Sequence, residues 1–277
     1  MIPELFRIGN FAISPFGVMM VLAFVAGYVQ LSWAMRHGGF GSEDDASALV
    51  FAAGVGGIVG AKVYYAVLHQ DWRLLFDRAG LVWYGGFIVA ALLVMWVLHR
   101  RRLPFVRTAD ATMVGVALGY GIGRIGCFLV GDDYGVPTGL PWGVTFPYGL
   151  PATTAANLRL EYGSHIPPDV PPDALVPVHP TQLYETALAL GIWAVGLWML
   201  RRRVRPGGAA LAVGALLAAE RFGIEFLRAK DDRFLHGFTL AQVISALLLV
   251  VVLVLWLRWR RGSAGRDAAE GARPRTA

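Results

Sequence analysis

Seven long apolar runs divide the chain, and polar or charged connections separate them. They lie at about 14–35, 47–68, 80–99, 109–130, 182–200, 208–227 and 237–258. A helix needs about 20 mostly apolar residues to cross the hydrocarbon core of a bilayer. The pattern therefore predicts an all-α polytopic membrane protein with seven transmembrane helices.

The two ends of the chain differ from this pattern. The first apolar run follows a short polar head, is too long for a signal-peptide core and has no small-residue cleavage site after it, so we expect it to remain as a span. Residues 262–277 are rich in Gly, Ala, Arg and Pro. We therefore predict one integral membrane domain over residues 1–261 and a disordered tail over 262–277.

The composition supports a membrane protein and argues against a soluble enzyme or a disordered chain. Hydrophobic residues make up 56% of the sequence and charged residues only 16%, against about 25% charged residues in soluble domains. The net charge of +6 raises the question of nucleic acid. The basic residues, however, fall in short clusters between apolar runs, as in cytoplasmic loops of membrane proteins, and we expect no nucleic-acid partner.

The distribution of basic residues predicts an orientation. Of the 25 Lys and Arg residues, 15 lie after the first, third and fifth runs and in the tail, and seven lie on the opposite side. Cytoplasmic loops carry the excess of Lys and Arg. We therefore expect a cytoplasmic C-terminus and, with seven spans, an N-terminus outside.

One connection, residues 131–181, is unusually long and contains ten prolines. Loops of this length are usually functional or disordered. Because the segment also carries Trp142, Phe146, Tyr148 and Tyr162, we expect a small ordered cap between spans 4 and 5, on the periplasmic face.

Metal and nucleotide sites find little support. Cys127 is the single cysteine, and the six histidines do not pair at metal-ligand spacing. Residues 121–126 match the G-x-G-x-x-G pattern, but inside an apolar run rather than after a strand. Glycines four residues apart, at 115, 119 and 123 and at 56 and 60, favour close packing of membrane helices.

Arg124 lies inside the fourth apolar run. A buried arginine in a membrane is costly and must face a polar cavity or a partner. Its planar fork suits a phosphate, and the glycines that follow, including Gly135, allow a ligand to approach the backbone. The alternative is an ion pair between helices, with Asp110 or Glu185 as the partner.

Further polar residues occur near the same ends of other runs. Arg221, Glu225 and Arg228 follow the i, i+4, i+7 spacing of one helix face, and we interpret this stripe as the lining of a polar cavity. Lys62 either extends to the interface or pairs with an anionic headgroup. Tyr84 either anchors the helix at the interface or faces the cavity.

The fifth run opens with residues 179–185, in which Pro180 suits a first helical turn. Gln182 and Glu185 then share a face at the membrane edge, whereas His179 is either a site residue or only the residue before the helix. Together these features predict a cation-rich pocket near the outer face that binds an anionic, lipid-like ligand.

Several segments, in the same order along the chain, resemble the motifs of the bacterial prolipoprotein diacylglyceryl transferases. They are GAKVYY at 60–65, VWYGG at 82–86, Asp110, GRIGCFLVGDDYG at 123–135, HPTQLYE at 179–185, RFGIEFLR at 221–228 and Gln242. The resemblance extends from Ile13 to about Trp259.

The resemblance implies a multi-pass enzyme of the bacterial inner membrane that uses no cofactor. Such enzymes transfer a diacylglyceryl group from phosphatidylglycerol to the lipobox cysteine in the signal peptide of a prolipoprotein, and release glycerol 1-phosphate. The catalytic residues would be Arg124, Arg221 and Tyr84. The substrate-binding residues would be Arg124, Asp132, Gly135, His179, Gln182, Glu185, Glu225, Arg228 and Lys62.

The chain also departs from the family pattern. Cys127 and Val130 replace asparagines, Asp132 replaces a glutamate, Tyr84 replaces a frequent histidine and Phe16 replaces a tyrosine. These changes keep open a non-catalytic or altered-acceptor lipid-binding paralogue. A transporter of an anionic solute is disfavoured because no internal repeat is evident.

Overall fold

The computed structural model describes residues 4–9, 11–76, 82–230, 233–235 and 237–271. Its long helices are α1 (Pro15–Gly38), α2 (Glu43–Leu68), α3 (Trp83–Arg100), α4 (Phe105–Val130), α6 (Thr181–Arg201), α7 (Gly208–Ile224) and α8 (Leu240–Gly271). Each of the seven predicted apolar runs is occupied by one of these helices.

The remaining elements are short. The chain begins with a hairpin of β1 (Phe6–Ile8) and β2 (Phe11–Ile13), and a second hairpin of β3 (Arg233–Leu235) and β4 (Phe238–Thr239) precedes α8. The 3₁₀-helix η1 (Trp72–Phe76) follows α2, and α5 (Ala155–Tyr162) lies in the long connection. The fold is therefore predominantly helical.

Local sequence signals set several helix ends. The Ser14 hydroxyl accepts a hydrogen bond from the amide of Gly17 at 3.1 Å, which satisfies a free donor at the start of α1. Ser42 and Asp45 form a reciprocal capping box at the start of α2. Gly39 and Gly131 end α1 and α4 with φ angles of 63° and 77°, a left-handed conformation that glycine adopts without strain.

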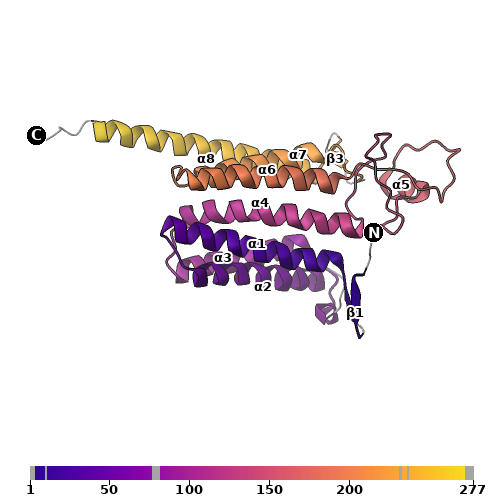
Figure 1. The fold of residues 1–277 in the computed structure, drawn as a ribbon, viewed down its shortest axis with the longest axis horizontal. Coiled ribbons are helices and arrows are strands. Elements are labelled where there is room, and N and C mark those ends of the chain that lie inside the picture. Colours follow the sequence, from indigo (N-terminus) through magenta and orange to yellow (C-terminus); the bar gives the residue numbers. More distant parts are fainter. Residues whose placement is uncertain (1–3, 10, 77–81, 231–232, 236, 272–277) are drawn as a thin grey trace, which may run out of the picture.

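The long helices run side by side and form one bundle (Figure 1). Helix α4 packs against α1 on one side and against α6 and α7 on the other, while α2 pairs with α3 and α8 packs on α7. Helix α5 and the N-terminal hairpin lie at one end of the bundle, and the end of α8 lies at the other (Figure 1).

Glycines bring α2 and α3 into close contact, as the four-residue spacing predicted. A Cβ atom on Gly60 would lie 2.3 Å from the carbonyl oxygen of Gly85, and one on Gly56 would lie 2.7 Å from Cα of Ala90. The prediction was wrong for Gly123, because among the described residues nothing lies within 4 Å of its added Cβ.

The helices carry large apolar side chains on their outer surface. Five of the described helices, α1, α2, α4, α6 and residues Leu240–Arg261 of α8, are long and apolar enough to cross a membrane. Residues Tyr84–Arg100 form a shorter apolar helix. Exposed residues such as Phe51, Leu92 and Val251 cannot be covered by water without a large cost. The chain is a polytopic membrane protein.

The connection between α4 and α6, residues 131–180, is called the cap segment below. It has its own small core, in which Tyr134, Phe146, Leu158 and Val178 are almost fully buried. The Tyr134 and Phe146 rings stack with their centroids 5.4 Å apart, and the Tyr134 hydroxyl donates to the carbonyl of Pro151. This core covers the end of the bundle at which α4 ends and α6 begins.

The C-terminal helix is longer than the apolar run from which it was predicted. Helix α8 continues to Gly271, past residue 261. Residues 272–277 lie outside the described residues, so the disordered tail and the division of the chain at residue 261 stay predictions.

Candidate functional site

Three arginines converge at the end of the bundle that the cap segment covers. Arg124 lies near the end of α4, Arg221 lies in the last turn of α7, and Arg228 follows that helix. Three carboxylates pair with them, and we call the six residues the arginine network. Its members are Arg124, Arg221, Arg228, Asp133, Glu185 and Glu225.

Glu185 is the centre of this network. Its carboxylate is fully buried and lies 3.1 Å from Nε of Arg124, 3.7 Å from Nη1 of Arg221 and 3.6 Å from Nη1 of Arg228. The hydroxyl of Tyr120 donates to it at 2.9 Å. A buried charge persists only with such compensation, so one carboxylate from α6 orients guanidinium groups from α4 and α7.

Asp133 bridges two of the arginines at the edge of the network. One oxygen lies 2.9 Å from Nη1 of Arg124, and the other makes a short contact with Nη2 of Arg228. Burial alone would raise the pKa of Asp133, but the charges of Arg228 and Arg124 outweigh it and hold the pKa below the ordinary value of 3.8. Its side chain is 39% exposed, the most of the three acids.

The predicted stripe of Arg221, Glu225 and Arg228 is present, although α7 ends at Ile224. Glu225 lies 2.8 Å from Nη2 of Arg221 and 3.9 Å from Nε of Arg228. The three side chains therefore face one another as the spacing predicted, and they point into the network rather than toward solvent.

The sequence left Asp110 and Glu185 as alternative ion-pair partners of Arg124, and the structure gives these two acids different contacts. Arg124 pairs with Glu185. Asp110 instead accepts hydrogen bonds at 2.7 Å from the amides of Gly207 and Ala210, and so caps the start of α7. The ion pair between helices therefore exists, but only with Glu185.

The start of α6 fixes the backbone that carries Asp133. Gln182 is fully buried and donates to the carbonyl of Asp132 at 2.6 Å, and Thr181 donates to the carbonyl of Asp133 at 3.0 Å. Gly135 pairs with Arg228 through a β-bridge. A Cβ on Gly135 would lie 2.6 Å from the carbonyl of Leu227, so only glycine fits there without a shift.

His179 lies in the cap segment, beside the network rather than within its ion pairs. Its Nδ1 lies 3.3 Å from the hydroxyl of Tyr184, which also accepts a hydrogen bond of 2.7 Å from the indole of Trp142. The side chain therefore belongs to a polar and aromatic group above the start of α6.

Three of the departures from the family pattern, Cys127, Phe16 and Asp132, lie at the network or in its surroundings. Cys127 is buried, with its sulfur 3.7 Å from Nη1 of Arg124. Phe16 of α1 packs near Gly126, because an added Cβ there would lie 3.2 Å from its ring. Burial raises the pKa of Asp132. The hydrogen-bonding surroundings of Arg124 thus differ from those that the family pattern implies.

Cys127, Asp132 and Asp133 also place one ligand atom each within 4.8 Å of one another. This spacing is compatible with a metal ion, but Asp133 is already engaged by two arginines. Two fixed cations oppose the approach of a third. The prediction that the chain needs no metal stays a prediction.

Tyr84 and Lys62 lie on a different pair of helices. Lys62 is half-buried on α2, and Tyr84 is exposed in the first turn of α3, whereas every ion pair of the network comes from α4, α6, α7 and the segments after α4 and α7. The assignment of both residues to the site stays a prediction.

Three residues in or beside the network were not selected from the sequence. They are Tyr120, Asp133 and Glu220. Tyr120 lies one turn before Arg124, and Glu220 is a buried acid beside Arg221. A glutamate inside an apolar run is a signal that could have identified Glu220, whereas nothing in the spacing distinguishes Asp133 from Asp132.

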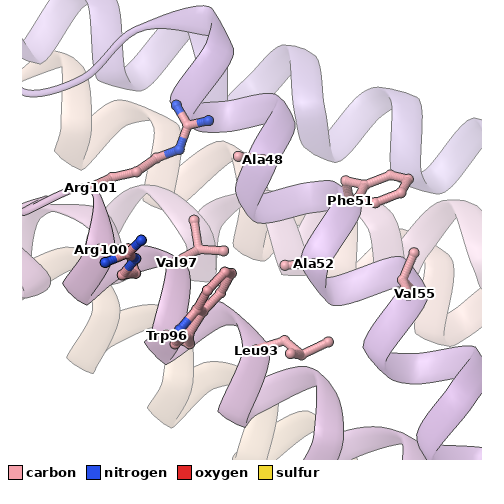
Figure 2. Close-up of a pocket in the computed structure, with 9 residues that line it drawn as sticks. All are labelled: Ala48, Phe51, Ala52, Val55, Leu93, Trp96, Val97, Arg100 and Arg101. Atoms are coloured by element: carbon pink, nitrogen blue, oxygen red, sulfur yellow. The ribbon is translucent and has the colours of Figure 1, made fainter.

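An apolar groove lies at the opposite end of the bundle, between α2 and α3 (Figure 2). It has a volume of about 390 Å³, and Arg100 and Arg101 lie at one end of it. Arg101 pairs with Asp44 and Asp45 at 2.6 and 2.8 Å. None of the predicted site residues lines this groove, so it is separate from the candidate site.

The three arginines of the network are matched by three carboxylates, so the excess of positive charge that the sequence predicted is not present among these six residues, and a phosphate would reach the arginines by replacing the partly exposed Asp133. Arginine offers parallel N–H donors that match phosphate oxygens. Buried carboxylates hold three arginines in place at the end of the bundle that the cap segment covers. In such surroundings fixed donors stabilise developing negative charge more strongly than water does.

Comparison with known proteins identifies the family. A model of the prolipoprotein diacylglyceryl transferase family matches residues 3–258. The chain belongs to this family. A phosphatidylglycerol–prolipoprotein diacylglyceryl transferase of Geobacter sulfurreducens is 27% identical over 276 residues, which cover 95% of this chain and 97% of that protein. The one from Dehalococcoides mccartyi is 31% identical over 262 residues, or 92% of each chain.

Membership of the family agrees with the order of the motifs along the chain. A further relative with the same name, from Pseudomonas fluorescens, is 28% identical over 283 residues and covers 97% of both chains. The similarity is therefore spread over the bundle and the cap segment together.

Proposed function

We propose that this chain transfers the diacylglyceryl group of phosphatidylglycerol to the lipobox cysteine thiol of a prolipoprotein. The observation that carries the proposal is that Arg124 and Arg221, from two helices, both pair with one buried carboxylate, that of Glu185. Relatives of nearly equal length carry the name of this activity.

In this reaction the cysteine sulfur forms a bond to the glycerol carbon of the diacylglyceryl group. The bond between that carbon and a phosphate oxygen breaks, its electron pair stays on the oxygen, and the thiol proton passes to a base. Glycerol 1-phosphate leaves with additional negative charge. Arg124 and Arg221 stabilise this charge, which is the electrostatic contribution that most lowers such barriers.

The other residues support the two arginines. Glu185 and Glu225 orient them, and Arg228 adds a third positive charge. Gln182 fixes the loop that follows α4 through its hydrogen bond to the carbonyl of Asp132, and Gly135 fixes the same loop through its β-bridge to Arg228. We assign His179, which lies in the cap segment, to substrate binding on the basis of the family motif.

Tyr84 and Lys62 serve the same reaction from the other helix pair. Tyr84 acts as the base for the thiol or as a hydrogen-bond donor to the lipid ester, and Lys62 contacts the headgroup. Both assignments rest on the family motifs and on the location of these residues in apolar helices.

We also propose seven membrane crossings in the bacterial inner membrane, with the N-terminus outside and the cap segment on the periplasmic face. Helices α3 and α7, of 18 and 17 residues, complete an alternating path between the two ends of the bundle. The excess of basic residues at the opposite end supports a cytoplasmic C-terminus.

The test is a transfer assay with the purified full-length chain in vesicles that contain phosphatidylglycerol. A lipobox peptide is the acceptor, and the same peptide with serine for cysteine is the control. We expect release of glycerol phosphate and a diacylglyceryl mass increase only with the cysteine peptide. Binding of phosphatidylglycerol without either product would overturn the proposal.

That outcome would favour a second candidate, a lipid-binding relative that is non-catalytic or uses another acceptor. The observation behind it is the contact between Cys127 and Arg124, where the family pattern has an asparagine. A Cys127→Asn substitution that restored transfer to the lipobox peptide would identify this position as the cause.

A further inference from the structure

A polar cavity lies at the end of the bundle opposite the arginine network. Its volume is about 670 Å³, within the range of about 300–1,000 Å³ that is typical of small-molecule sites. The end of α1, the start of α4, the end of α6 and the connection to α7 form its walls. We call it the basic cavity.

Positive charge dominates the lining of the basic cavity. Four arginines contribute to it, Arg36, Arg107, Arg201 and Arg203, against one carboxylate. That carboxylate, Asp110, is already occupied by two backbone amides at the start of α7. The lining itself therefore offers no free acid to neutralise its arginines.

Three of these arginines, Arg107, Arg201 and Arg203, also lack an acidic partner elsewhere among the described residues. Arg36 pairs with Glu43 at 2.7 Å, and Arg201 lies over the ring of Trp33 at 5.7 Å. Within the part of the chain that the structure describes, Arg107 and Arg203 form no ion pair. An anion in the cavity would offset the repulsion between these charges.

Apart from His37, the remaining side chains of the lining are apolar. Trp33, Phe40, Leu200 and Val204 line the same cavity, and the apolar parts of α1, α4 and α6 begin directly beside it. A ligand that fits both halves of this lining is amphiphilic, with a phosphate and an apolar part. Basic pockets between membrane helices on the cytoplasmic side bind anionic lipid headgroups in this way.

We propose that the basic cavity binds the phosphate-bearing headgroup of an anionic phospholipid. Arg107 and Arg203 hold the phosphate, and the glycerol and upper acyl chains rest on Trp33 and Phe40. This site is separate from the arginine network, which lies at the other end of the bundle, and it performs no chemistry. It does not depend on the proposed transfer activity.

The test measures lipid binding to the purified full-length chain in a neutral detergent. The probes are dioctanoyl phosphatidic acid, the matching phosphatidylcholine and inorganic phosphate. The variants are the double substitution Arg107→Gln with Arg203→Gln, the single Arg107→Gln in case the double variant does not fold, and Arg202→Gln as a control. Arg202 lies between two lining residues but does not line the cavity.

We expect the wild-type chain and Arg202→Gln to bind phosphatidic acid more tightly than phosphatidylcholine. The double variant should lose about tenfold or more in affinity, since it removes two charge-assisted contacts. Equal loss in Arg202→Gln, or no loss in the double and single variants, would overturn the proposal. Equally tight binding of inorganic phosphate would show that the site takes a soluble anion instead of a lipid.

Discussion

Arg124 and Arg221 should be sensitive to substitution because both depend on Glu185 and both face the proposed phosphate position. We expect Arg124→Ala or Arg221→Ala to reduce transfer by about 100-fold or more, as for other groups that stabilise transition-state charge. The measurement is peptide lipidation at equal amounts of protein in the membrane. Lysine at either position should recover part of the activity, and full activity in both alanine variants would contradict the assignment.

Asp133 is the network acid that a lipid phosphate can most easily replace, because its side chain is 39% exposed and it already bridges Arg124 and Arg228. Asp133→Asn removes this competing charge. Asparagine also tolerates the left-handed backbone, with φ of 58°, that this position adopts. We expect a lower KM for phosphatidylglycerol, by about threefold to tenfold for one removed charge.

The pKa of Asp133 determines the pH range of this effect. Its pKa in the folded chain is lower than the ordinary value, so the carboxylate stays ionised at neutral pH and the ion pairs weaken only as the pH falls through that lowered pKa. The difference in KM should therefore be constant between about pH 6 and 8. A KM that rises in the Asn variant would show that Asp133 positions the arginines and does not compete with the lipid.

Tyr84 is exposed at the start of α3. It acts as a base for the thiol, as a hydrogen-bond donor to the lipid ester, or only as an interface anchor, and two substitutions distinguish these roles. Tyr84→Phe removes only the hydroxyl, so unchanged turnover would leave the interface role alone. Tyr84→His should retain or raise turnover if a base is needed, since the reference pKa of histidine is about 6.5. Lower turnover with histidine would favour the phenol as a donor. We expect Tyr84→Phe to reduce turnover in the peptide assay.

At the scale of single elements, the start of α7 depends on a residue from another helix. Asp110 of α4 accepts from two amides of the α7 start, at Gly207 and Ala210. We expect Asp110→Ala to lower stability by about 0.5–2 kcal/mol, the usual cost of losing a cap. The measurement is the thermal midpoint of the purified chain in detergent.

Asp110→Asn provides the matched comparison for this element. Its amide oxygen replaces part of the acceptor capacity, so its thermal midpoint should lie between those of the alanine variant and the wild type. Transfer activity at low temperature should remain in both variants, because the arginine network lies at the other end of the bundle. If either variant lost transfer activity while its thermal midpoint stayed at the wild-type value, Asp110 would have a role in the transfer reaction.

For the whole molecule, the proposed orientation can be tested with fusions. A C-terminal alkaline phosphatase, which is active only outside the cytoplasm, should stay inactive, and a fusion within the cap segment, after Gly163, should be active. Gly163 ends α5 in an exposed turn with φ of 59°, where insertions disturb little packing. An active C-terminal fusion would mean that the number of crossings is even.

The sequence alone determined the helices and their approximate ends. Each apolar run became a helix because every backbone polar group inside a membrane must be paired within its own segment. Local capping residues such as Ser14, Ser42 and Gly131 then set the ends. Helix α7 ends earlier than predicted, at Ile224, where the polar residues after it pair with Glu185 and Asp133.

The tertiary structure decided which charges meet. From the sequence, Asp110 and Glu185 were equal candidates for Arg124, and Asp133 was indistinguishable from Asp132. The choice depends on how α4, α6 and α7 rotate against one another, and contacts between distant segments set this rotation. Spacing along one helix predicts which residues share a face. It does not specify which face of a neighbouring helix they will meet, because that follows from packing of the whole bundle.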